Sequence, residues 1–225
     1  MNYKINIIPL FTSIISFVFA ALLLRQFIQR RKLHQLMWTI ALLFYGISAL
    51  MELLMNPDIL DFNVSLFSVF YITATSLVGF LGAGQLYLVV KHKVSHIFLA
   101  FVLIFSLVLL VGTILKVEDF PDLLSLSLTG DLGEDIRVIS KDYLSSVYIY
   151  VVILASVGGT VLLVGSLYSF VRDRTRYYAL FFTFGAIFPF LRNIPFGYLG
   201  NELAAVILFF IGFILSILYM NKQNV

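Results

Sequence analysis

The 225-residue chain contains no cysteine and few charged residues. Without cysteine it cannot form a disulfide, a thiolate metal site or a cysteine nucleophile. Asp, Glu, Lys and Arg make up only 12% of the residues and 61% are hydrophobic, against roughly half in a soluble domain. This composition predicts an integral membrane protein. The net charge is only +3 and the basic residues are divided among several loops, so nucleic acid is not an expected partner.

Histidine is also scarce, and the three histidines, His34, His92 and His96, all fall beside the basic loops. Zinc-dependent seven-helix hydrolases need several histidines together with acids at one face, whereas here the acids and the histidines are expected on opposite sides. Bis-histidine haem proteins and intramembrane serine proteases need histidine within the spans. His92 and His96 have the i, i+4 spacing that binds a metal on a continuous helix, but a loop between two spans is expected to interrupt it. We therefore expect no enzymatic activity, no metal and no cofactor.

Long apolar stretches recur along the whole sequence. A helix needs about 20 mainly apolar residues to cross the bilayer core, so we predict an all-α fold with one seven-helix transmembrane domain over residues 1–225. A cleaved signal peptide is the alternative for residues 1–24, but its basic residues should precede the apolar run, and here they follow it. The predicted spans lie near 5–28, 36–55, 64–90, 95–116, 144–170, 177–197 and 202–220.

The charges in the connections predict the orientation, because short loops rich in Lys and Arg stay in the cytoplasm. Asp173 is the single acid on the basic side of the seven-span arrangement. The N-terminus is therefore expected outside and the C-terminus inside, in a multi-pass protein of the cell membrane. The basic side holds Arg25, Arg30, Arg31, Lys32, Lys91, Lys93, Arg172, Arg174, Arg176 and Lys222. The opposite side holds Asp58, Asp61, Glu118, Asp119, Asp122, Asp131, Glu134, Asp135 and Asp142.

Two further features follow from this arrangement. Residues 117–143 form the one long connection, and their alternating pattern around Thr-Gly-Asp favours a short outer hairpin over a disordered acidic loop. Trp38, Tyr177 and Tyr178 fall at the inner ends of spans, where aromatic residues anchor helices at the lipid interface.

Arg192 interrupts an otherwise apolar span between Pro189 and Pro195. It lies roughly 24 Å from the inner end at 1.5 Å per residue, level with Glu52 on the second span. Glu202 begins the seventh span a short turn later. Arginine within a membrane usually faces the bundle interior and finds a partner, so the spacing predicts a Glu52–Arg192–Glu202 cluster near the outer surface.

The candidate ligand-binding residues are this cluster together with Tyr45 and Ser48, which share a helix face with Glu52, and Asn193 beside the arginine. Three other roles stay open. The charges can form a structural ion pair, Arg192 can extend to the interface, and Glu202 can serve as a first-turn acid behind Asn201 as N-cap.

Short motifs indicate a relationship: "HQLMW" at 34–38, "GAGQLYLV" at 82–89, "LLVGSLYSF" at 162–170 and "GFIL" at 212–215. With the second span ending at Glu52, they make the chain similar to an uncharacterised prokaryotic family of seven-helix integral membrane proteins. The topology also resembles that of microbial rhodopsins, but the seventh span has no lysine to hold retinal. The resemblance implies an architecture and no reaction.

Two functions are compatible with these features. The first is a non-enzymatic receptor-like sensor or accessory subunit whose outer polar pocket binds a small polar or anionic ligand, with basic inner loops that meet anionic lipid or a protein partner in the membrane or cytoplasm. Signal output is then expected to need another chain. The alternative is a small-solute secondary transporter or proton-coupled channel in which Glu52 titrates. Transport ranks second because no internal repeat is evident and the charges lie toward one face.

Overall fold

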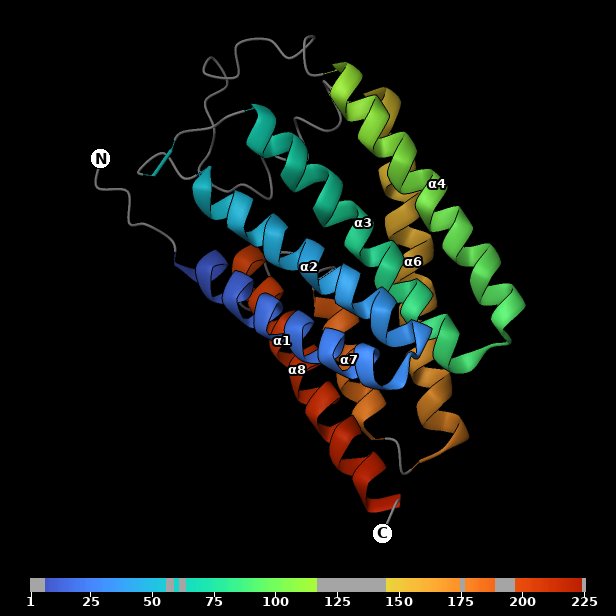
Figure 1. Cartoon of the computed structure of the whole chain (residues 1–225). Helices are drawn as coiled ribbons and strands as arrows, with labels where there is room; N and C mark the ends of the chain where they lie inside the picture. Colours follow the sequence, from blue (N-terminus) through green and yellow to red (C-terminus); the bar gives the residue numbers. More distant parts are fainter. Residues whose placement is uncertain are drawn as a thin grey trace.

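The computed structural model describes residues 7–55, 59–60, 64–116, 145–174, 177–188 and 197–223. Seven α-helices account for nearly all of these residues (Figure 1). Their bounds are α1 Ile8–Arg30, α2 Leu33–Leu54, α3 Val64–Val89, α4 His92–Lys116, α6 Ser145–Arg172, α7 Tyr178–Ile187 and α8 Gly197–Gln223. The all-α prediction is confirmed for the described residues, and the number of helices agrees with the predicted seven.

Five of these helices, α1, α2, α3, α4 and α6, are long and apolar enough to cross a membrane. The chain is accordingly a multi-pass membrane protein. The described part of α7 has ten residues, which span about 15 Å, so it covers only half of the predicted sixth span. The rest of that span, including Pro189 and Arg192, and the predicted hairpin within 117–143 lie outside the described residues.

Local residues determine where α1 begins, where it ends and how the chain turns into α2. Pro9 lies in the first turn of α1, where a missing N–H costs no helical hydrogen bond. At the other end, Arg31 adopts a left-handed conformation with φ 52°, and its N–H donates to the Phe27 carbonyl at 2.7 Å. This bond caps the helix, Lys32 is extended, and α2 begins at Leu33.

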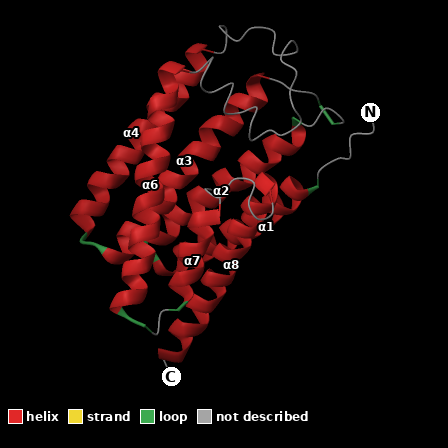
Figure 2. Ribbon diagram, turned by 180° about the vertical axis from the view of Figure 1, so that it is seen from behind, coloured by secondary structure: helices red, strands yellow, loops and turns green. Residues whose placement is uncertain are grey.

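Six helices form a closed ring, and the seventh lies outside it. Going round the ring, α1 packs on α2, α2 on α3, α3 on α6, α6 on α7, α7 on α8, and α8 returns to α1. Helix α4 packs against the outside of the ring on α3 and α6, and it forms one edge of the molecule in both views (Figures 1 and 2). Its large aliphatic side chains are mostly exposed, as expected of a helix that faces lipid.

Successive helices alternate in direction, so alternate connections meet at one end (Figure 1). This end, called the basic end below, carries the α1–α2 turn, the α3–α4 turn and the α6–α7 connection. The cations Arg30, Arg31, Lys32, Lys91, Lys93, Arg172 and Arg174 are exposed there. At the opposite end α2 and α4 end, and α3, α6 and α8 begin.

Candidate functional site

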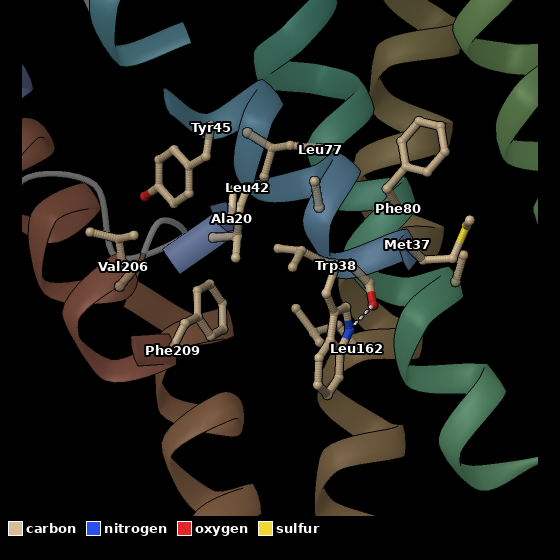
Figure 3. Close-up of a cluster of buried hydrophobic side chains, with 14 of the residues drawn as sticks. Ala20, Met37, Trp38, Leu42, Tyr45, Leu77, Phe80, Leu162, Val206 and Phe209 are labelled. Carbon is tan, nitrogen blue, oxygen red and sulfur yellow. Dashed lines mark hydrogen bonds between the residues drawn. The ribbon is translucent and has the colours of Figure 1, made fainter. Parts of the chain in front are cut away.

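The polar stripe predicted on α2 faces the bundle interior. Tyr45, Ser48 and Glu52 are only 5%, 4% and 2% exposed. The Ser48 hydroxyl donates to the Tyr45 carbonyl at 2.9 Å, so this serine is satisfied by its own helix. In Figure 3 the Tyr45 ring lies above Leu42, with its hydroxyl on the side of Val206 of α8.

Glu52 lies in the last turn of α2, near the end opposite the cations. It is one of the largest fully buried side chains among the described residues. A buried carboxylate requires polar partners, because desolvation of an unpaired charge is far costlier than the loss of one hydrogen bond. Helix α8 begins at this same end, and the buried Asn201 lies in its first turns.

The structure leaves the rest of the predicted cluster open. Arg192 and Asn193 lie outside the described residues, as does the side chain of Glu202. The helix directions bring Glu52 and the backbone of Glu202 to the same end of the bundle. The meeting of their charged groups stays a prediction.

Helix α1 contributes buried polar groups that the sequence analysis missed. Thr12, Ser13 and Ser16 are each at most 2% exposed. The Ser13 hydroxyl donates to the Gly46 carbonyl at 2.9 Å and links α1 to α2, while within the described part of the chain Thr12 and Ser16 have no side-chain hydrogen-bond partner. All three lie in the half of α1 that is nearer the Glu52 end. The i, i+4 spacing of Thr12 and Ser16 was a detectable signal.

Trp38 corrects one prediction, because it is not an anchor at the lipid interface. The side chain is 7% exposed, and its indole N–H donates to the Leu81 carbonyl of α3 at 3.3 Å (Figure 3). Its ring stacks on Phe182 of α7, with centroids 5.1 Å apart. Phe182 in turn stacks on Phe209 of α8 at 6.1 Å. We call these three rings the aromatic layer; it joins α2, α7 and α8 across the ring of helices.

Three of the short motifs that carry the family resemblance contact one another near this layer. Trp38 packs against Gly84, where an added Cβ would collide with the indole ring. The next residue, Gln85, packs against Gly165, and its amide donates to the Ser169 hydroxyl at 3.5 Å. The conspicuous residues of these motifs therefore make helix contacts.

A second correction concerns His92 and His96. Helix α4 begins at His92, so the two residues do share a continuous helix, with ring centroids 6.4 Å apart. The Tyr87 hydroxyl lies 2.7 Å from Nδ1 of His96. Across the described ranges, no group of three or more His, Cys, Asp or Glu side chains is placed to hold a metal ion.

Fold and composition define the class as a multi-pass α-helical membrane protein with a buried acidic residue near one end. Comparison of the chain with protein-family models, curated proteins and solved structures finds no match. The resemblance to a prokaryotic seven-helix family thus stays a prediction.

Proposed function

We propose that this chain is a non-enzymatic receptor-like sensor or accessory subunit of the cell membrane, whose outward-facing polar site binds a small polar or anionic ligand. The observation that carries the proposal is the buried Glu52 at the end opposite the cations. Carboxylates inside membrane bundles are rare and usually mark functional sites. In this proposal Arg192 is the donor of paired hydrogen bonds to the ligand, with Tyr45, Ser48, Asn193 and Glu202 around it.

The proposed orientation places the basic end in the cytoplasm. Seven exposed cations at that end, from Arg30 to Arg174, support it, because cytoplasmic loops carry the excess of Lys and Arg. The ligand site would then open to the outside, and the basic end would meet anionic lipid or a protein partner.

A small-solute transporter or proton-coupled channel is the second candidate, and the burial of Glu52 favours it as well. A transported solute would have to pass from Glu52 to the basic end. Between these levels the stacked rings of Trp38, Phe182 and Phe209 join α2, α7 and α8. A solute would have to pass this aromatic layer, which supports binding over transport.

A ligand screen on purified protein tests the proposal. Thermal unfolding in detergent is followed by the fluorescence of Trp38, the single tryptophan of the chain, in acetate, glutamate, inorganic phosphate and sulfate. We expect at least one anion to raise the unfolding midpoint of the wild type. Glu52→Gln and Arg192→Ala should abolish that shift, whereas Asp173→Asn and Arg174→Ala, which remove one acid and one arginine at the basic end, should preserve it.

Reconstituted liposomes distinguish the two candidates. Uptake of the stabilising anion that is lost in Glu52→Gln, with folding intact, would establish transport instead of sensing. Unfolding of both Glu52→Gln and Arg192→Ala without any ligand would assign the two charges a structural role and reject the ligand site.

A further inference from the structure

The α3–α4 turn presents a compact group of cations at the edge of the molecule. Helix α3 ends at Val89 and α4 begins at His92. The turn is tight, since the Val94 N–H donates to the Lys91 carbonyl at 3.1 Å. Lys91, His92 and Lys93 are all exposed. The sequence from 62 to 117, which includes both helices, contains no acidic residue, so these two helices offer the lysines no counter-ion.

An exposed aliphatic surface lies next to these cations. Val94 is 48% exposed and Ile97 is 72% exposed, both in the first two turns of α4. Leu88, in the last turn of α3, is also exposed. Because α4 packs on the outside of the ring, this surface faces lipid. A positively charged turn directly above a lipid-facing aliphatic surface complements a molecule with an anionic head and an apolar tail.

Tyr87 and His96 add a fixed polar group at the same place. Tyr87 is buried, and its hydroxyl lies 2.7 Å from His96 Nδ1. A phenol donates readily, so we assign the hydroxyl proton to this hydrogen bond, which leaves the proton of a neutral imidazole on Nε2. His96 is exposed, and Nε2–H is then available as a donor. The Tyr87 ring also lies 6.2 Å from that of His92, so one buried side chain supports both histidines.

We propose that this turn binds the phosphate group of an anionic phospholipid whose acyl chain lies along α4. Lys91 and Lys93 supply the charge, His96 supplies a donor, and Val94 and Ile97 contact the chain. The site is at the opposite end from Glu52 and does not depend on the proposed ligand site. It identifies one specific lipid site within the diffuse positive charge of the basic end.

The test measures lipid binding to delipidated protein in detergent. Phosphatidylglycerol is titrated against phosphatidylcholine, and bound lipid is counted by native mass spectrometry. We expect preferential retention of phosphatidylglycerol. An exposed lysine near a membrane surface contributes about fivefold in affinity for an anionic lipid, so Lys91→Gln with Lys93→Gln should weaken retention roughly 25-fold. His96→Asn should weaken it while leaving both lysines in place.

The matched control is Arg172→Gln with Arg174→Gln, which removes the same charge from another exposed connection at the basic end. This variant should retain the lipid within about twofold of the wild type, on the same scale of charge effects. Equal losses in the two double variants would overturn the proposal in favour of diffuse attraction. Unchanged retention after loss of both lysines would overturn it outright. Glu52→Gln should leave lipid retention unaltered, so failure of this site and failure of the ligand site give separate results.

Discussion

Gly84 sets the position of Trp38. An added Cβ at Gly84 would collide with the indole ring, and that ring is held from its other sides by Phe182 and by the hydrogen bond to Leu81. We therefore predict that Gly84→Ala displaces Trp38 and destabilises the fold by about 1–3 kcal/mol, the usual cost of overpacking. The measurement is thermal unfolding in detergent together with Trp38 emission, which should shift as the ring leaves its stack.

Gly46→Ala is the control for that prediction. An added Cβ there would meet the ring of Phe17 at 2.8 Å, but Phe17 is partly exposed and can turn toward lipid. It should leave the Trp38 emission unchanged. Equal emission shifts in the two variants would contradict the account of Gly84.

For individual residues, the sequence predicted the shared face correctly where the helical period determines which residues lie together. The spacing of Tyr45, Ser48 and Glu52 places them on one face, and that face is buried. The prediction failed for Trp38, because a position near a helix end does not reveal whether the side chain points to lipid or into the ring. The partners of Glu52 stay predicted, because Arg192 and the side chain of Glu202 lie outside the described residues.

At the scale of helices, glycine determines how closely α3 and α6 approach. A Cβ added to Gly158 would lie 2.8 Å from the Val78 carbonyl oxygen and 3.0 Å from the Gly79 Cα. A Cβ added to Gly82 would lie 2.7 Å from the Gly158 carbonyl oxygen. These neighbours are backbone atoms, so relief requires the two helices to separate. Small residues allow helix backbones to approach this closely, and Gly79 lies at the contact.

We predict that Gly158→Ala destabilises the protein by about 2–3 kcal/mol, near the upper end for overpacking, because whole helices must move apart. Gly112→Ala between α4 and α6 is the comparison, since its Cβ would meet one Val147 methyl group at 3.0 Å, and a side chain relaxes more easily than a backbone. Denaturant unfolding of both variants measures the difference. A larger loss in Gly112→Ala would show that the α3–α6 contact is not the tightest constraint.

Helix bounds were the most predictable feature at this scale. Length and apolarity decide which segments can span a bilayer, and α1, α2, α3, α4 and α6 begin and end within a few residues of the expected limits. The beginning of α4 was harder to predict from the sequence. The basic residues around His92 suggested a longer loop, whereas the chain reverses within two residues and places His92 in the helix.

At the scale of the whole molecule, no periodic pattern in the sequence predicts which helices pack side by side. Successive spans cross the membrane in opposite directions, and this alternation brings the cations to one end. The closure of six helices by the contact of α8 with α1, and the exclusion of α4 from that ring, follow from side-chain packing between segments far apart in the chain. The sequence of α4 is the most apolar of the five long spans, which agrees with its peripheral position and its few buried residues.

The orientation of the whole bundle is open to a direct test, because a chain without cysteine gives no background in thiol labelling. Single cysteines replace Lys32 and Arg174 at the basic end and Leu60 at the opposite end, all exposed positions. Since basic loops stay in the cytoplasm, a membrane-impermeant maleimide applied to intact cells should label Leu60→Cys at least about tenfold faster than the other two, an estimate from the exclusion of polar reagents by the bilayer core. All three should react once the membrane is opened by detergent. Labelling of Lys32→Cys and Arg174→Cys in intact cells would reverse the bundle and place the Glu52 end in the cytoplasm, where it could not serve as an external ligand site.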